Sequence, residues 1–302
     1  GCYDPTARLA DMDQGHIEAQ LCFPSSFPRF CGQTFSETKD KDLGLACIEA
    51  YNNWMIEEWC ADSNGRLMPL AIVPLWDPEL AATELLRNVR RGVRAVTFSE
   101  IPAYLGLPSI HTEYWDPFFA ACAEHGVSIH MHIGSSSKMP STSPDAPALV
   151  ASALTFGNAM SSMVDFMLSG VLVRFPELQL AYSEGQIGWI PYILERTDHV
   201  WEANRAWGDV GDSVPEPPST YFHRQIYACF FEDEFGLTSE ALNKITPQRI
   251  LFETDYPHSD SVWPETEATA QRLMGHLDQE TVNLLCRGNA IKLLDLDLPV
   301  NP

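Results

Sequence analysis

Length, composition and charge place this chain among acidic globular proteins. It has 302 residues, of which 45% are hydrophobic and 20% are charged, a composition typical of soluble domains. The formal net charge is −22, since 41 Asp and Glu outnumber 19 Lys and Arg. This charge repels nucleic acids and anionic membranes, so neither is an expected partner. With no recognisable signal peptide and no apolar run of about 18 residues, the sequence predicts a cytoplasmic protein.

Short apolar runs recur along the chain and predict β-strands, because each is rich in branched or aromatic residues and bounded by polar, Gly or Pro residues. Helical spacing of apolar residues, at three and four, falls between them. The predicted strands are residues 19–23, 67–74, 93–98, 127–133, 178–182, 225–230 and 249–253. The predicted helices are residues 40–60, 78–90, 114–125, 152–168, 189–207, 239–245 and 278–294, with a further helix before residue 19.

Strict alternation of strand and helix predicts parallel strands joined by crossover helices. The expected fold is an α/β (β/α)8 TIM barrel of the metal-dependent hydrolase type, as one domain over residues 1–302. Only seven strands can be recognised, so a closed barrel requires another strand before Gly1. We favour a first strand missing from this chain over an open seven-stranded or doubly wound sheet. Loop excursions are expected at residues 24–38, 135–147 and 208–220.

The eight cysteines form no CxxC pair and are scattered through apolar segments. In a chain of this length, that pattern predicts buried, reduced thiols and not a disulfide framework.

Two candidate functional residues follow the strand at 93–98. Glu100 and His111 come after this strand and therefore belong to the face where barrel enzymes keep their sites. Both are candidates for substrate binding, and a structural role in the loop is the alternative for His111.

Two histidines in the strand at 127–133 form the strongest local signal. His130 and His132 lie two residues apart in VSIHMHIG, so both imidazoles point to the same face. His132 is nearer the carboxyl end, where an imidazole is well placed to bind a metal. A pair of packed, hydrogen-bonded core histidines is the alternative interpretation.

Two acids follow the strands at 178–182 and 249–253. Glu184 begins a Gly-rich turn, and Asp255 precedes Tyr-Pro in FETDYPH. A carboxylate at the barrel mouth can ligate a metal or carry a proton, so both are candidate catalytic residues. The alternatives are a helix N-terminal acid for Glu184 and a turn cap for Asp255. His258 is a candidate for contact with the substrate.

These segments resemble the amidohydrolase-related group that contains aminocarboxymuconate semialdehyde decarboxylase. The resemblance is carried by WDPFFAACAEHGVSIHMHIG, LQLAYSEGQIGWIPYILER, RILFETDYPHSD and the closing RGNAIKLLDL. It implies a distorted TIM barrel with one divalent metal ion, zinc as the first expectation and manganese or another ion as the alternative, and it suggests a homodimer.

The resemblance also implies roles for particular residues. His132 matches a metal-ligating histidine and Asp255 matches the aspartate of the last strand, whereas Glu184 stands where the family has a catalytic histidine. The family's first strand carries an HxH pair of ligands that has no match here. His130 and Glu184 are the residues that could complete the ligand set.

The leading hypothesis is non-oxidative decarboxylation of a small aromatic or unsaturated carboxylic acid, assisted by the metal as a Lewis acid. Arg29 and Lys138, on loops at the mouth, are candidates for holding the substrate carboxylate. Metal-dependent hydrolysis of an amide, ester or lactone is the alternative. A metal-free barrel acting as a binding or assembly subunit is the second alternative.

Overall fold

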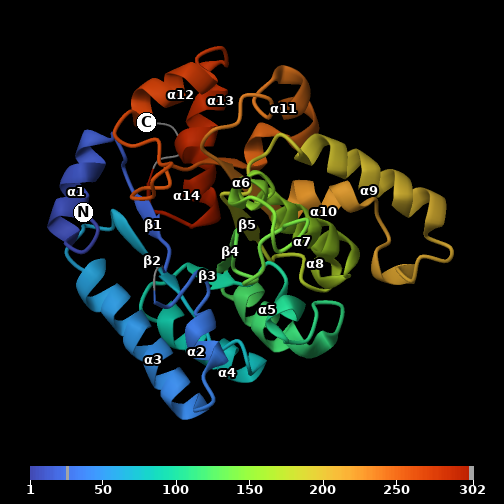
Figure 1. Cartoon of the computed structure of the whole chain (residues 1–302), viewed down its shortest axis with the longest axis horizontal. Coiled ribbons are helices and arrows are strands. Elements are labelled where there is room, and N and C mark those ends of the chain that lie inside the picture. Colours follow the sequence, from blue (N-terminus) through green and yellow to red (C-terminus); the bar gives the residue numbers. More distant parts are fainter. Residues whose placement is uncertain (25–26, 299–302) are drawn as a thin grey trace.

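Seven parallel strands form one sheet whose spatial order follows the order along the chain (Figure 1). The computed structural model describes residues 1–24 and 27–298. Within this part of the chain all seven predicted strands are present, and each is shorter than its apolar run. Their bounds are β1 Gln20–Cys22, β2 Leu67–Ala71, β3 Ala95–Phe98, β4 Ser128–His132, β5 Leu180–Ser183, β6 Ile226–Phe230 and β7 Ile250–Phe252.

Helices connect successive strands and surround the sheet on its outside, as a TIM-barrel topology requires (Figure 1). Their bounds are α1 Pro5–Gln14, α2 Gln33–Glu37, α3 Lys41–Trp54, α4 Pro78–Val89, α5 Asp116–Glu124, α6 Ala148–Ala153, α7 Phe156–Leu168, α8 Val171–Arg174, α9 Ile190–Asn204, α10 Pro218–Gln225, α11 Ser239–Ile245, α12 Thr266–Met274, α13 Gln279–Asn283 and α14 Asn289–Leu293. Two π-helical turns extend this set, Met55–Trp59 after α3 and Leu284–Gly288 between α13 and α14. None of the helices in residues 1–24 and 27–298 is long and apolar enough to cross a membrane.

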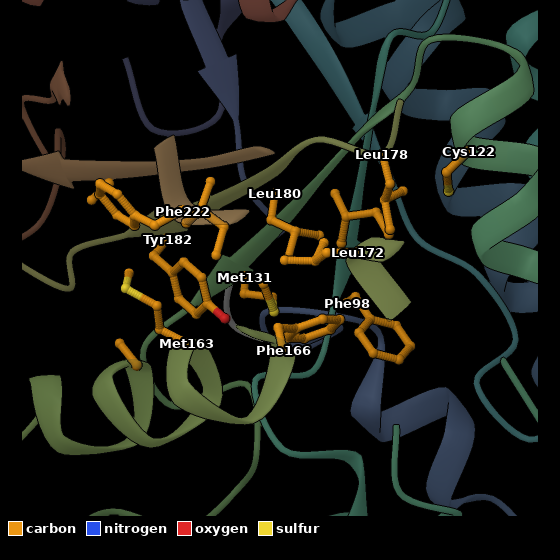
Figure 2. Packing of buried hydrophobic residues seen from close by; sticks show 14 of the residues in the cluster. Phe98, Cys122, Met131, Met163, Phe166, Leu172, Leu178, Leu180, Tyr182 and Phe222 are labelled. Carbon is orange, nitrogen blue, oxygen red and sulfur yellow. The ribbon is translucent and has the colours of Figure 1, made fainter. Parts of the chain in front are cut away.

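Alternate residues of each strand supply the two faces of the sheet. Phe98, Met131 and Tyr182 point outward into the main hydrophobic core, where they pack against Phe166 of α7 and neighbouring side chains (Figure 2). Residues of opposite parity line the inner face, which carries His130 and His132 near the carboxyl end of β4. Side-chain alternation thus directs apolar residues into the packed outer layer and leaves the inner face for the polar side chains of the candidate site.

The closing segment of the chain covers the lower part of the inner face. Leu293 of α14 packs against Tyr227 and Leu251, and Leu294 packs against Leu70. Asn289, fully buried, donates hydrogen bonds from its amide nitrogen to the carbonyls of Pro247 and Ile250 at 2.7 and 2.8 Å. The GNA motif therefore fastens the C-terminal helix to the start of β7.

The two ends of the sheet approach one another without pairing in the described residues. Gln20 of β1 and Arg8 of α1 both donate hydrogen bonds to the carbonyl of Tyr256, which follows β7. Trp263 donates from its indole nitrogen to the carbonyl of Asp11 in α1 at 2.9 Å. Side chains and α1 thus connect β1 to the segment after β7 along this flank, as in a barrel of TIM type.

Several sequence predictions of element boundaries need correction. The strand predicted at 67–74 ends at Ala71 because the side-chain amide of Asn52 takes over both backbone groups of Ile72, at 2.9 and 3.0 Å. The helix predicted at 152–168 is broken between α6 and α7 at Leu154. Helix α10 begins inside the Pro-rich loop predicted at 208–220, and no element was predicted over the residues of α12.

The prediction of buried thiols holds for only some of the cysteines. Cys31, Cys122 and Cys229 are buried, whereas Cys2 and Cys286 are exposed, so the prediction was wrong for these two.

The two Asp-Pro pairs behave differently at their helices. Asp77 caps α4 through hydrogen bonds from the backbone nitrogens of Glu79 and Leu80. Asp116 also precedes a proline, but it is the first residue of α5 and does not cap that helix. A 3-10 turn over Glu113–Trp115 runs directly into α5, so the Asp116 carboxylate accepts from the guanidinium of Arg174 instead.

Candidate metal and active site

The register of β4 and β5 brings the first two site residues together. His132 is the Cα partner of Ser183, so Glu184, the next residue, leaves the sheet beside the imidazole. Nε2 of His132 lies 2.7 Å from Oε1 of Glu184, and both side chains are about nine-tenths buried. The strand order thus turns a separation of 52 positions in sequence into a direct contact.

The imidazole of His132 is held firmly in one orientation. Its Nδ1 lies 2.7 Å from the carbonyl oxygen of Ile133, which requires a proton on Nδ1. Phe30 stacks on the ring at 4.0 Å with an interplanar angle of 11°, and Phe23 presents an edge at 5.0 Å. Nε2 is therefore directed at Glu184, and a contact of 2.7 Å between these two atoms requires a shared proton or a cation.

Asp255 and His258 approach the same point from the turn after β7. Oδ2 of Asp255 lies 2.9 Å from Nδ1 of His258, and the Asp255 carboxyl is hydrogen-bonded to Glu184. One ligand atom each from Glu184, Asp255 and His258 all lie within 4.8 Å of one another. Together with Nε2 of His132, this gives two carboxylates and two imidazoles at the carboxyl ends of β4, β5 and β7.

The pKa values of two adjacent carboxyl groups at the site, Glu184 and Asp255, are shifted in opposite directions. Burial opposes ionisation of Glu184, but the hydrogen bond and positive charge of His132 outweigh it and hold the pKa of Glu184 below its usual range. Burial, followed by the hydrogen bond and charge of Glu184, raises the pKa of Asp255 to about 9. The pair therefore keeps one proton at neutral pH, as expected for like charges in contact.

Both carboxylates project from strained backbone. The φ angle is 58° at Glu184 and 54° at Asp255, in the left-handed region that side chains other than Gly rarely occupy. Glu253 supports this geometry, because its Oε1 accepts a hydrogen bond of 2.6 Å from the backbone nitrogen of Glu184. Burial and the charge of Glu184 raise the pKa of Glu253 well above its usual range. Strain at two neighbouring positions is typical of functional sites.

The donor set fits a divalent cation. Three acidic groups, Glu184, Asp255 and Glu253, crowd around one point, and the protons they retain offset their mutual repulsion. A divalent ion bound by carboxylate oxygens and imidazole nitrogens would replace those protons and relieve the repulsion. Oxygen and nitrogen ligands of this kind suit zinc or manganese.

His130 and Glu100 lie near this cluster without joining it. Nε2 of His130 is 2.9 Å from Oγ of Ser128, and burial lowers the pKa of His130 to about 3. Glu100 is 2% exposed, and neither of its carboxyl oxygens has a hydrogen-bond partner. Burial raises the pKa of Glu100 to about 8. The structure therefore places His130 below the site, turned toward the amino end of β4, and Glu100 in an isolated position at the end of β3.

The remaining predicted site residues lie on surrounding loops with partners of their own. His111 contacts Asp165 of α7 at 2.5 Å. Arg29 bonds to the carboxylate of Glu37 at 2.9 Å and to the hydroxyl of Ser137. Lys138 places its ammonium group 4.5 Å above the ring of Tyr104.

Three residues of the site were not predicted from the sequence. Glu253 lies two positions before Asp255 and has the inward parity of β7, so strand alternation could have indicated it. Phe23 follows β1 in the same way. Phe30 lies in the long loop after β1, where no periodic pattern gives the direction of a side chain.

Comparison with known proteins identifies the class to which this fold and site belong. Residues 1–296 match the amidohydrolase family, and the chain belongs to that family. A gamma-resorcylate decarboxylase from Rhizobium radiobacter is 26% identical over 239 residues, which span 72% of this chain and 68% of the relative.

Solved structures show the same fold. An amidohydrolase from Mycobacterium avium subsp. paratuberculosis superposes with a TM-score of 0.77 at 23% identity, over 96% of this chain and 74% of that one. A dihydroxybenzoic acid decarboxylase from Polaromonas superposes with a TM-score of 0.72 at 20% identity, over 98% and 87% of the two chains. That structure contains manganese and the inhibitor 2-nitroresorcinol.

Replacement of Glu100 by Gln should stabilise the protein in a pH-dependent manner. Burial raises the pKa of Glu100 to about 8, so the folded chain holds a proton that the unfolded chain releases above roughly pH 4.5. Wild-type stability therefore falls as pH rises between these values. Urea unfolding should show Glu100→Gln more stable by about 3 kcal/mol at pH 7 and nearly equal at pH 4. The same difference at both pH values would contradict this, and Glu124→Gln, at an exposed position, is the control.

Replacement of Glu253 should test its support of Glu184. In Glu253→Gln the amide oxygen can still accept from the backbone nitrogen of Glu184, whereas Glu253→Leu leaves that donor unpaired. We expect Glu253→Leu to weaken Mn²⁺ binding about tenfold in isothermal titration calorimetry, and Glu253→Gln to remain closer to wild type. Equal binding by the Leu variant and wild type would show that the contact does not position the site.

Proposed function

We propose that this chain is a metal-dependent, non-oxidative decarboxylase of a small aromatic or unsaturated carboxylic acid. The observation that carries the proposal is the convergence of His132, Glu184, Asp255 and His258 at the carboxyl ends of the barrel strands. The gamma-resorcylate decarboxylases among the curated relatives support this reaction class. Zinc is the proposed ion, and manganese, present in the Polaromonas structure, is the alternative.

Each residue of the site would have a separate role in the proposed reaction. A divalent ion held by His132, Asp255 and His258 would neutralise the substrate carboxylate and orient its ring. Loss of CO2 leaves an electron pair on carbon, and that carbon must receive a proton. Glu184 is in hydrogen-bond contact with both His132 and Asp255, so it is the proposed proton carrier. Phe23 and Phe30 keep the imidazole in place and exclude water from one side of it.

One observation favours hydrolysis as a second candidate. The pKa of Glu184 is held below its usual range by His132, so this carboxylate is ready to accept a proton from water. A group in that state suits attack of water on an amide, ester or lactone. Decarboxylation instead requires Glu184 to be loaded with a proton before each turnover.

The proposal extends to partners and location. A small-molecule substrate fits a site built from a few converging side chains, and a homodimer is the proposed assembly. The net charge of −22 disfavours nucleic acid as a partner. A cytoplasmic location is proposed on the composition of the chain.

A paired substrate screen distinguishes the candidate functions. Purified protein loaded with Zn²⁺ or Mn²⁺ is offered hydroxylated aromatic acids, with CO2 release as the signal, and esters and lactones, with acid release as the signal. We expect CO2 from at least one aromatic acid. Turnover of an ester without CO2 from any acid would favour the hydrolase. Retention of less than about a tenth of an equivalent of metal would favour the metal-free binding protein.

Replacement of Glu184 by Gln should remove proton transfer and preserve the fold. The amide is nearly isosteric but cannot carry a proton between His132 and Asp255, so turnover should fall about 100-fold or more. Metal content, measured by mass spectrometry of the bound ion, should stay within about a factor of two if Glu184 is not a principal ligand. Glu177→Gln, at an exposed position outside the site, is the matched control. Unchanged turnover would remove Glu184 from the mechanism.

A further inference from the structure

The turn that carries Glu184 out of β5 is fastened to the loop that follows β6. The two strands are parallel neighbours, so both segments leave the sheet at its carboxyl end. Oδ2 of Asp233, in the loop after β6, accepts hydrogen bonds from the backbone nitrogens of Ile187 and Gly188 at 2.8 and 2.6 Å. Oδ1 accepts from the backbone nitrogen of Gly236 in its own loop at 2.8 Å. One carboxylate therefore binds three backbone donors and joins the two segments.

Backbone groups meet the charge of Asp233. The acids on either side of it, Glu232 and Glu234, both pair with Arg272. In the part of the chain that the structure describes, the half-buried Asp233 forms no such ion pair. The two nitrogens that it binds across the gap stand just before α9, at the positive end of the helix dipole, where a carboxylate is favoured. Hydrogen bonds to an ionised acceptor are also stronger than neutral ones.

Two glycines permit the close approach of turn and loop. A Cβ atom at Gly236 would lie 2.3 Å from Cγ1 of Ile187, and a Cβ atom at Gly188 would lie 2.9 Å from Oδ1 of Asp233. Both separations are shorter than 3.0 Å, a distance below which real Cβ atoms are essentially never found. A larger residue at either position would push the loop away from the turn. The bridge through Asp233 thus depends on backbone that only glycine supplies.

The bridged turn is strained at two of its residues. The φ angle is 58° at Glu184 and 55° at Gln186, both in the left-handed region. Backbone of this kind persists only where its surroundings hold it in place. At its β5 end the turn is held by Oε1 of Glu253, which accepts from the backbone nitrogen of Glu184 at 2.6 Å. At its α9 end the turn is held by Asp233, so the strained residues lie between two carboxyl groups that bind their backbone.

From this geometry we propose that Asp233 is a positioning residue for Glu184. By holding the α9 end of the turn, its carboxylate keeps Oε1 of Glu184 at 2.7 Å from Nε2 of His132. A displacement of about 1 Å at a reacting group can cost about 100-fold in rate, so release of this turn would impair the site. The effect on turnover rests on the proposed function, in which Glu184 carries the proton. The placement of Glu184 against His132 does not rest on it.

The placement of Glu184 is tested by NMR of the full chain, without metal or substrate. Histidine is isotope-labelled, the imidazole resonances of His132 are assigned with His132→Gln, and Glu184→Ala gives their positions when the carboxylate is absent. We expect Asp233→Ala to move the His132 resonances toward those positions. Asp198→Ala is the matched control, because Asp198 is also half-buried and accepts from the backbone nitrogen of Ser219 at 2.8 Å, and it should leave them unmoved. Wild-type resonances in folded Asp233→Ala would overturn the proposal.

Two further variants keep the test decisive if Asp233→Ala folds poorly. Asp233→Ser shortens the side chain, so that its hydroxyl can accept from Gly236 in its own loop but does not reach the turn. Asp233→Asn retains an amide oxygen that can accept from Ile187 and Gly188. We expect the His132 resonances to be displaced in the Ser variant and close to wild type in the Asn variant. Identical resonances in the two variants would show that the bridge does not position the site.

A double substitution tests the consequence for turnover of a substrate found in the screen. Asp233→Ala should lower kcat about tenfold and leave KM within about twofold, because a proton carrier acts in the transition state. In a Glu184→Gln background the same substitution should have little further effect, since the group that it positions is already lost. An equal loss of kcat in both backgrounds would overturn the proposal. Absence of turnover in the wild type would refute the proposed function alone, because the NMR result is independent of it.

Discussion

The hydrogen-bonded register between β4 and β5 fixes everything that follows at the carboxyl end of the sheet. Because His132 is opposite Ser183, Glu184 can only leave the sheet next to the imidazole. A slip of one residue would turn His132 into the outer core and bring Met131 to the inner face. The outer core prevents this, since Met131 and Tyr182 fill positions that a polar side chain would leave poorly packed. Packing on the outer face of the sheet therefore determines which side chains point into the candidate site on the inner face.

Charge at the site follows from this constraint. The sheet delivers Glu184 and Asp255 into contact, and Glu253 enters from the strand beneath them. In the protein without a bound ion, protons must offset part of this negative charge, and His132 supplies part of the compensation. The Polaromonas decarboxylase structure, which has the same fold, contains manganese. The histidine expected from the resemblance is replaced by Glu184, which increases the acidity of the cluster.

The sequence was sufficient where a short-range pattern determines the structure. Strand alternation predicted that His130 and His132 share a face, and strand ends predicted the positions of Glu184 and Asp255. The sequence was insufficient where a contact between residues far apart in the chain determines where a strand ends or how a side chain is oriented. Nothing near Asn52 in the sequence indicates that its amide would end β2, and nothing near Phe30 indicates that its ring would stack on His132. Both contacts depend on how a loop or helix packs across the barrel, which local spacing does not encode.

Glu100 illustrates the same limit for chemistry. Its place after β3 suggested contact with a substrate, yet its side chain has the outward parity of Phe98 and is enclosed by protein. The alternation of side chains along the strand can be read from the sequence and gives the face of the sheet. It does not show which residues cover the carboxyl group of Glu100. A residue at the correct end of a barrel strand can thus belong to the packed outer layer.

The left-handed backbone at Glu184 and Asp255 has a consequence for protein engineering. A side chain in this conformation costs about 1 kcal/mol relative to glycine, so a search for thermostabilising substitutions would select glycine at both positions. Each gain would delete a carboxylate from the mouth of the barrel. Thermal stability and the carboxylates of the site therefore place opposite demands on these two residues. A thermostable variant that keeps both carboxylates would need stabilising substitutions at other positions.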